Sequence, residues 1–323
     1  MGGENKSLEL IKSLLTEQYG AELASKILSG YFANRKPSLR INPLKGERES
    51  TLSELKSAGI ELTPAGWYED GFVIENANES AIQALPTYAE GRVYLQSLSS
   101  MLPPILMNPK IGTDILDMAA APGSKTTQIA AITKNNCRIT ACEMNHIRAE
   151  RLRHNVSLLG ASGVYVMETD SRRLDSAFSF DSVLLDAPCS GSGTLHFNEE
   201  TSQENSGFTE ELISKCVRSQ KALIAKAISL LKPGREMMYS TCSILSRENE
   251  DIVSWALSGG GVEIVPLCED WLDTLPRLPV RIDGTLCVMP DEHYEGFFIA
   301  KLKKVGKSNL KIQESKPKGR RRH

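Results

Sequence analysis

The stretch Asp114-Ile-Leu-Asp-Met-Ala-Ala-Ala-Pro-Gly-Ser-Lys-Thr126 decides the fold of this chain. Its first five residues form a strand-like run, and we expect a helix to begin near Lys125 after a loop of small residues. Small residues let a ligand approach the backbone closely, and the N-terminus of a helix offers unpaired amide donors. The stretch therefore predicts a ligand site at the carboxyl end of a strand, where open α/β sheets bind their ligands.

Strand-like and helix-like stretches alternate strictly from residue 110 onward. This alternation predicts an α/β fold with a doubly wound, mostly parallel sheet, because crossover helices join parallel strands. A late strand, Gly296–Leu302, is expected to join the sheet at or near its edge. The other expected strands are Asp114–Met118, Arg138–Glu143, Val164–Glu168, Ser182–Leu185 and Glu236–Tyr239, and the expected helices are Lys125–Ile132, His146–Leu159 and Leu212–Leu231.

Three parts are expected along the chain: an α+β unit over residues 1–90, the α/β domain over 91–302, and a basic, disordered tail over 303–323. Residues 301–323 contain ten Lys or Arg and one Glu, a net charge of +9, so the rest of a chain with total charge −2 carries −11. A basic tail binds phosphates through counterion release, or it is only a solvated end. The elements expected in the first unit are helices Leu8–Gln18, Ala21–Phe32 and Thr51–Ala58, and strands Leu39–Asn42 and Gly71–Glu75.

The composition, with 41% hydrophobic and 24% charged residues, is that of an ordinary globular protein. No apolar stretch reaches the roughly 20 residues that a membrane-spanning helix needs, and the N-terminus lacks the apolar segment of a secretory signal. The seven cysteines are odd in number and no two have Cys-x-x-Cys spacing, which argues against a disulfide framework and a structural zinc site. We therefore expect a protein of the reducing cytoplasm that needs neither a metal nor a membrane.

Acidic residues end the next two predicted strands. Glu143 lies twenty residues beyond Gly123, where a carboxylate accepts hydrogen bonds from ribose hydroxyls, and Asp170 is placed to meet a base. With the small-residue loop, these acids predict an adenosine-containing cofactor. A plain strand-to-helix turn would explain the loop but not the acids, and both the Walker A pattern and the Gly-x-Gly-x-x-Gly fingerprint are absent.

Two further segments, Asp186-Ala-Pro-Cys189-Ser and Tyr239-Ser-Thr-Cys242-Ser, follow predicted strands. Because parallel strands end at a common sheet edge, two thiols and a carboxylate should lie beside the cofactor loop. A single free cysteine is usually a small buried apolar residue. A thiolate is also a strong nucleophile whose ordinary pKa of about 8.5 is readily lowered, so paired thiols at this edge indicate covalent catalysis.

These segments resemble motifs of the Sun/Nop family of S-adenosylmethionine-dependent RNA cytosine-5 methyltransferases. The resemblance extends over roughly residues 36–302 and implies a class I methyltransferase fold, Rossmann-like, behind a small RRM-like RNA-binding unit. Ala119 stands where many relatives have cysteine, and Ser124 where many have glycine, but neither change removes a group that the chemistry needs. The matching stretches are Leu39–Lys45, Tyr94–Ser97, Asp117–Thr126, Asp186–Thr194, Tyr239–Glu250 and Gly296–Ala300.

The resemblance implies that Cys242 adds to carbon 6 of the cytosine and that Cys189 aids product release. Spacing alone does not decide between the thiols, because DNA cytosine-5 methyltransferases carry their nucleophile in a Pro-Cys motif, which here is Cys189. Asp186 is expected to hydrogen-bond the cytosine edge, and Lys125 to reach that carboxylate. The expected cofactor contacts are Ala119, Ala120, Ala121, Pro122, Gly123, Ser124, Lys125, Glu143, Arg148, Asp170 and Asp186.

RNA, either rRNA or tRNA, is the partner that the resemblance implies, and nothing in the sequence requires more than a monomer. The target cytosine must leave its stack before a thiol reaches carbon 6. Arg35, Lys36, Arg40 and Lys45 near the first strand are expected to form part of the RNA platform. Two other classes stay open: a non-catalytic RNA-binding or assembly factor with this fold, and a DNA methyltransferase, which would need a large target-recognition region after the catalytic motifs.

Overall fold

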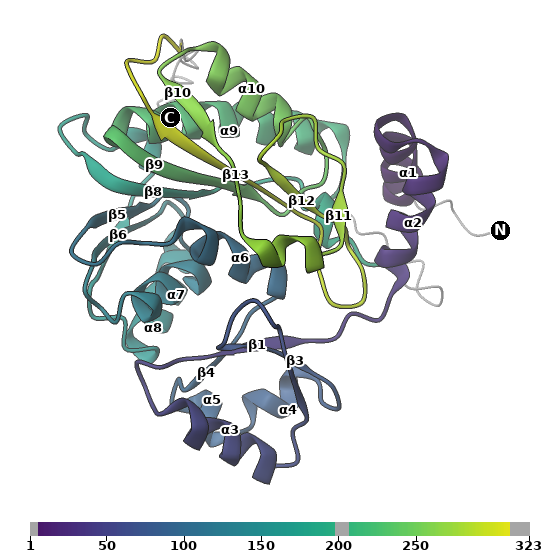
Figure 1. The fold of residues 1–323 in the computed structure, drawn as a ribbon, viewed down its shortest axis with the longest axis vertical. Helices are drawn as coiled ribbons and strands as arrows, with labels where there is room; N and C mark the ends of the chain where they lie inside the picture. The colour runs from purple at the N-terminus through teal and green to yellow at the C-terminus, as the bar shows by residue number, and fades with distance from the viewer. Residues whose placement is uncertain (1–5, 198–206, 311–323) are drawn as a thin grey trace, which may run out of the picture.

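Two sheets organise the computed structural model, which describes residues 6–197 and 207–310 (Figure 1). The large sheet has the strand order β11-β12-β13-β9-β8-β5-β6-β7, with β10 paired to β13. Its strands are β5 (Asp114–Asp117), β6 (Arg138–Glu143), β7 (Val164–Glu168), β8 (Phe180–Asp186), β9 (Leu231–Thr241), β10 (Val262–Val265), β11 (Arg277–Leu278), β12 (Leu286–Val288) and β13 (Phe297–Lys304). The helices that follow or flank these strands are α6 (Leu98–Met107), α7 (Ser124–Ile132), α8 (His146–Leu158), α9 (Glu210–Leu230) and α10 (Glu250–Ser258).

The parallel half of the large sheet agrees with the sequence prediction. Strands β5, β6, β7, β8 and β9 pair in parallel, and β6 and β7 have the predicted bounds. The predicted strand positions are therefore confirmed, although β9 begins at Leu231, well before the expected start at Glu236. All of these strands end at one edge of the sheet, so the segments that follow them converge there.

The last expected strand joins the large sheet near its edge, with only short strands outside it. β13 is not at the sheet edge: it pairs antiparallel with β9 on one side and with β12 and β10 on the other. The segment 262–288, which was not predicted to contain strands, supplies β10, β11 and β12 and covers the outer side of β13. Alternation along β13 also shows two buried faces, since Phe297 and Ile299 pack into one core while Phe298, Ala300 and Leu302 pack into the other.

The small sheet has the order β2-β3-β1-β4 and is wholly antiparallel. Strand β4 lies beyond residue 90, so this sheet extends past the domain boundary expected from the sequence. Leu39, Phe72 and Val93 belong to a core of its own. The strands are β1 (Ser38–Ile41), β2 (Leu62–Pro64), β3 (Gly71–Ile74) and β4 (Val93–Leu95), and the helices beside them are α3 (Arg48–Ser57), α4 (Glu79–Gln83) and α5 (Pro86–Ala89).

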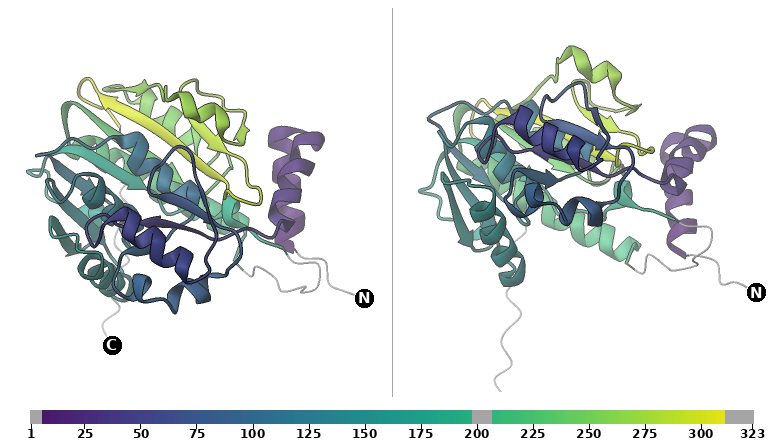
Figure 2. Two further views of the ribbon diagram at one scale, coloured as in Figure 1. Left: turned by 60° about the horizontal axis from the view of Figure 1, so that its bottom comes forward. Right: turned by 90° about the horizontal axis from the view of Figure 1, so that it is seen from below.

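The first two helices, α1 (Lys6–Tyr19) and α2 (Ala21–Phe32), do not pack on the small sheet. Figure 2 shows them at one side of the molecule, apart from the small sheet. Ile11 and Ile27 are fully buried in the core that also contains residues of α9 and β13, and the Tyr31 hydroxyl donates to the Ser192 carbonyl at 2.6 Å. These helices thus extend the large domain, because their apolar faces are buried there.

The small sheet and the large domain are joined by aromatic contacts as well as by the chain. Trp67 stacks on Trp271 with ring centroids 5.4 Å apart, and the Trp67 indole donates to the Tyr294 hydroxyl at 2.9 Å. These contacts tie the small sheet to the segments before and after β12. Within the described residues, every helix is too short or too polar to span a membrane.

Candidate active site

The cofactor loop, residues 119–123, connects β5 to α7 and is held from several sides. The Ala120 amide donates to the Cys142 carbonyl at 2.9 Å, and the Thr126 hydroxyl donates to Asp117 Oδ2 at 2.6 Å. Gly123 has φ +107°, and a Cβ at this position would lie 2.9 Å from Leu152 Cδ1. Only glycine satisfies both the backbone conformation and the space at the start of α7.

Helix α8 braces the outside of this loop. The Arg148 guanidinium donates to the Ala121 carbonyl at 2.7 Å and lies 3.3 Å from Glu143 Oε2, while the Asn155 amide donates to the Pro122 carbonyl at 2.8 Å. Glu143 is buried, and its Oε1 also accepts from the Asn145 amide at 2.8 Å. The acid at the end of β6 is therefore oriented by its own helix and keeps lone pairs available for a ligand.

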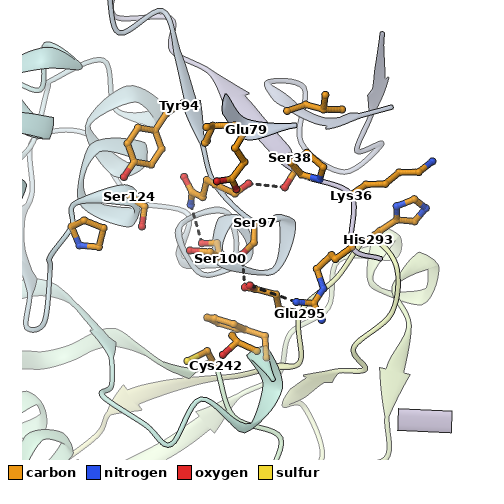
Figure 3. Close-up of a pocket in the computed structure, with 18 of the residues that line it drawn as sticks. Lys36, Ser38, Glu79, Tyr94, Ser97, Ser100, Ser124, Cys242, His293 and Glu295 are labelled. Carbon is orange, nitrogen blue, oxygen red and sulfur yellow. Dashed lines mark hydrogen bonds and ion pairs between the residues drawn. The ribbon is translucent and has the colours of Figure 1, made fainter. Parts of the chain in front are cut away.

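A cavity of about 1070 Å³ separates the small sheet from the carboxyl edge of the large sheet (Figure 3). In this view Tyr94 and Ser124 lie on one side, Lys36 and His293 on the other, and Cys242 below them. The predicted site residues that do not line it are Gly123, Glu143, Arg148, Asp170 and Cys189. Those that do are Ala119, Ala120, Ala121, Pro122, Ser124, Lys125, Asp186 and Cys242.

The Lys125–Asp186 ion pair forms part of the cavity wall. Lys125 Nζ is 2.7 Å from Asp186 Oδ2 and also donates to the Ser100 hydroxyl at 2.9 Å. The Ser240 hydroxyl donates to Asp186 Oδ1 at 2.7 Å, so both oxygens of the carboxylate are held in place. Lys125 is 7% exposed and lies 5.3 Å from the centroid of the Phe297 ring. Sequence reasoning found the pair but missed Ser100 and Ser240, which have no chemical signal apart from their neighbours.

The two predicted thiols are in contact, with Cys189 Sγ 2.9 Å from Cys242 Sγ. Both cysteines are half-buried, but Cys242 alone lines the cavity. The hydrogen bond with Cys242 and burial together raise the pKa of Cys189 well above its ordinary value. The geometry thus distinguishes a thiol that faces the cavity from one that lies behind it and remains protonated.

Asp117 is the acid closest in sequence to the cofactor loop, and it was not among the predicted site residues. It lines the cavity, yet burial raises its pKa to about 6, and its Oδ1 has no hydrogen-bond partner in the described structure. An unpartnered buried oxygen is costly unless a ligand supplies a donor. Asp170, which was expected to meet the base of the cofactor, accepts from the backbone amide of Arg172 at 3.1 Å, and the Arg172 guanidinium lowers its pKa.

Of the four basic residues expected in the RNA platform, three are accessible and one is buried. Arg35 and Lys36 line the cavity, whereas the exposed Lys45 does not. Arg40 is fully buried: its Nε donates to Gln96 Oε1 at 2.9 Å and its Nη2 to the Thr127 hydroxyl at 2.7 Å. The expectation that Arg40 meets RNA is therefore wrong, because this buried side chain joins β1 to α7.

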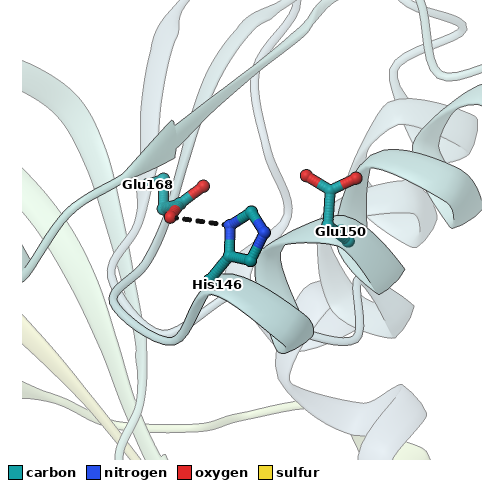
Figure 4. Close-up of side chains that lie close together, drawn as sticks. All are labelled: His146, Glu150 and Glu168. Atoms are coloured by element: carbon teal, nitrogen blue, oxygen red, sulfur yellow. Dashed lines mark hydrogen bonds and ion pairs between the residues drawn. The ribbon is translucent and has the colours of Figure 1, made fainter.

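A different group of potential metal ligands lies on the surface of α8 and β7 (Figure 4). His146 Nδ1 is 3.0 Å from Glu168 Oε1, and Glu150 lies close to both. Arg153 pairs with Glu150 and, at 3.1 Å, with Glu168, so a cation already balances the two carboxylates. None of these residues lines the cavity, and the group explains no part of the site.

The sheet order, the antiparallel β13 and the cofactor loop define a class I methyltransferase fold. Residues 104–303 match the family described as 16S rRNA methyltransferase RsmB/F, and residues 10–80 match its ferredoxin-like domain. The chain belongs to this RsmB/F family, which confirms the resemblance to Sun/Nop methyltransferases.

Several curated relatives are named ribosomal RNA small subunit methyltransferase F. The chain is 37% identical over 278 residues to ribosomal RNA small subunit methyltransferase F of Klebsiella pneumoniae (strain 342), covering 83% of this chain and 57% of that protein. The corresponding protein of Escherichia coli O6:H1 is 36% identical over 279 residues, with the same coverage of 83% and 57%. The chain thus spans less than two thirds of the length of these relatives.

Solved structures support the fold over nearly the whole chain. A methyltransferase homolog from Pyrococcus horikoshii superimposes with a TM-score of 0.78 at 32% identity, covering 94% of this chain and 96% of that one. NSun6 from the same organism, crystallised with SFG, gives a TM-score of 0.80 at 23% identity, covering 92% and 98%. At that identity, the second similarity concerns the fold alone.

Proposed function

We propose that this protein is an S-adenosylmethionine-dependent RNA methyltransferase that methylates carbon 5 of a cytosine, with rRNA of the small ribosomal subunit as the preferred substrate. The observation that carries the proposal is that one cavity holds the cofactor loop, the Lys125–Asp186 ion pair and the Cys242 thiol. The name of the curated relatives favours rRNA over tRNA. The presence of both thiols and of Asp186 speaks against a non-catalytic binding factor.

The residues of the cofactor loop suit an adenosine-containing cofactor. Ala119, Ala120 and Ala121 leave backbone accessible, and Asp117 Oδ1 lacks a donor that a ligand amino group would provide. Glu143 and Asp170 lie outside the lining of this cavity. Glu143 would accept from ribose hydroxyls, and Asp170, oriented by Arg172, would accept from the base with its remaining lone pairs. S-adenosylmethionine supplies an electrophilic methyl group when bound.

The catalytic residues of this chain would activate the cytosine for methylation. Carbon 5 is a poor nucleophile until the Cys242 thiolate adds to carbon 6, which breaks the aromaticity and turns carbon 5 into an enamine-like nucleophile. Asp186, fixed by Lys125 and Ser240, keeps lone pairs to accept a hydrogen bond from the exocyclic amino group of the cytosine. This contact orients the base so that carbon 6 faces the thiolate.

The second thiol would act after methyl transfer. A base removes the proton from carbon 5, and the carbon 6–sulfur bond breaks to restore the aromatic ring. Cys189, which is protonated and 2.9 Å from Cys242 Sγ, is placed to donate a proton to the departing thiolate. Its role is thus product release, and Cys189→Ala should accumulate a covalent protein–RNA adduct.

The proposal is tested by nucleoside mass spectrometry after incubation with isotope-labelled S-adenosylmethionine. The substrates are naked 16S rRNA, assembled small ribosomal subunits and bulk tRNA, and Cys242→Ala is the control. Labelled 5-methylcytosine in one rRNA fraction, absent with the variant, is the expected result. Label in tRNA alone would overturn the choice of substrate, and absence of label from every fraction would overturn the proposed activity.

A further inference from the structure

Glu248 is a fully buried carboxylate between the two cysteine segments. Its Oε1 accepts from the Ser190 amide at 2.8 Å, and its Oε2 accepts from the Ser190 hydroxyl at 2.6 Å and from the Ser243 hydroxyl at 2.7 Å. The Gln220 amide adds a longer contact of 3.4 Å to Oε1. One side chain therefore receives donors from two loops and from α9.

The two serines that Glu248 holds are the residues that directly follow Cys189 and Cys242. Ser243 and Ser192 are also joined through their hydroxyls at 2.8 Å, and the Gly193 amide donates to the Cys242 carbonyl at 3.0 Å. The loops that carry the thiols are thus tied together at the position after each cysteine. Between these loops, the two sulfur atoms lie 2.9 Å apart.

The charge of Glu248 has no cationic partner: within residues 6–197 and 207–310, no Lys or Arg forms an ion pair with it. Burying a carboxylate without a cation is costly, even when donors surround it. A glutamine would accept most of the same hydrogen bonds, since serine hydroxyls both donate and accept. The structural link alone therefore does not explain why this position carries a negative charge.

We propose that Glu248 is a positioning residue that fixes the two thiols in contact and, through its charge, keeps the proton of the pair on Cys189. The inference rests on the proposed role of Cys242 as nucleophile. A fixed negative charge disfavours a second anion nearby, and Glu248 contributes to the raised pKa of Cys189. Cys189 then holds the proton needed at product release, and Cys242, which lines the cavity, is the thiol placed to attack the base.

The other titratable groups around Glu248 do not compete for this role. Cys216 on α9 has its pKa raised to about 11, chiefly by burial. Tyr239 on β9, whose hydroxyl donates to the Glu248 carbonyl at 2.6 Å, has its pKa raised well above the ordinary value by burial. Both groups stay protonated at neutral pH. The charge of Glu248 therefore affects the ionisation of the Cys189–Cys242 pair.

The test measures ionisation of each thiol separately. Wild type and Glu248→Gln are alkylated with iodoacetamide across a pH series, and the modified cysteines are quantified by peptide mass spectrometry. Access to a thiol changes the extent of labelling, whereas ionisation changes the pH midpoint. Removing the charge should lower the Cys189 midpoint by about one pH unit, equivalent to about a tenfold change in thiolate fraction. Steady-state assays should show a lower kcat with the KM for RNA unchanged.

Two further variants separate charge from structure. Glu250→Gln changes another buried acid of the same segment that lies beside Cys287 instead of the thiol pair, and it should leave both midpoints unchanged. Ser243→Ala removes one donor from Glu248 but keeps its charge, so the Cys189 midpoint should rise. A wild-type midpoint in Glu248→Gln with an unchanged melting temperature, or a fall in Ser243→Ala, would overturn the proposal. Because alkylation needs no RNA, this test is independent of whether the proposed activity is found.

Discussion

The two sides of the cavity are built in different ways. The cofactor side is one continuous segment, residues 119–124, held by its neighbours on β6 and α8. The opposite side, which would hold the cytosine and is called the base side, is assembled from Ser100, Lys125, Asp186 and Cys242. These residues come from four separate parts of the chain. A continuous segment carries its own signal in the sequence, whereas an assembled one depends on how the strands are ordered. Variants should therefore separate cofactor binding on one side from chemistry on the other.

Cys242→Ala should cause the largest loss of methyl-transfer activity. Loss of a covalent nucleophile is expected to reduce kcat by at least about 10⁴-fold, because the remaining contacts cannot activate carbon 5. Affinity for S-adenosylmethionine, measured by isothermal titration calorimetry, should stay within about twofold of wild type because Cys242 is not part of the loop. Substantial residual methyl transfer would exclude Cys242 as the nucleophile.

Asp186→Asn should have the next largest effect. The change removes the charge that orients the base and leaves the Lys125 ammonium, which is 7% exposed, without its ion-pair partner. A loss of about 10²–10³-fold in kcat is expected, as for other preorganised polar groups. Single-turnover rates at saturating cofactor measure it, and Asp181→Asn, on the same strand, is the control. A variant with wild-type rates would mean that Asp186 does not contact the reacting base.

Gly123→Val tests the cofactor side. The valine side chain would meet Leu152, and the backbone at this position has a left-handed conformation that valine rarely adopts. Cofactor affinity should therefore fall at least about tenfold, and the free energy of unfolding should fall by about 1–3 kcal/mol. Gly112→Val is the matched control, because its φ is +79° but no atom lies within 4 Å of the added Cβ. Calorimetric affinity should separate the two variants: if both lose it equally, backbone strain and not the loop contact is responsible.

Asp117→Asn sharpens the comparison through pH. Burial raises the pKa of Asp117 from 3.8 in the unfolded chain to about 6 in the folded protein. Protonated Asp117 therefore contributes stability that is fully present below pH 3.8 and is lost as the pH rises through 6. Relative to wild type, the variant should gain up to about 3 kcal/mol of unfolding free energy between pH 4 and pH 7. Urea unfolding at both values measures this gain.

The control for this effect is Asp114→Asn. Arg138 lowers the pKa of Asp114, so its carboxylate stabilises the fold above the unfolded pKa, and that contribution is lost as the pH falls. The variant should therefore lose stability relative to wild type as the pH rises, opposite in sign to Asp117→Asn. Equal pH dependence of the two variants would contradict the assignment of a raised pKa to Asp117.

The sequence predicted the parts of the fold whose signals are local. Strand and helix periods placed β5 to β9 and the intervening helices, and the motifs predicted Lys125, Asp186 and both thiols at one edge. It did not predict β10, β11 and β12 outside β13, since the segment 262–288 has only short strands. Nor did it show that α1 and α2 pack on the large domain.

By itself, then, the sequence determined the parallel sheet, the cofactor loop and the chemistry of the thiol and carboxylate side chains. Only the tertiary structure decided which basic residue is buried, as Arg40 shows, and which thiol faces the cavity. It alone brought Ser100, Ser240 and Glu248 to the residues of the proposed catalytic site. The physical reason is that hydrophobic period and motif chemistry are properties of short segments, whereas burial and hydrogen bonding between distant residues arise only when the strands are packed.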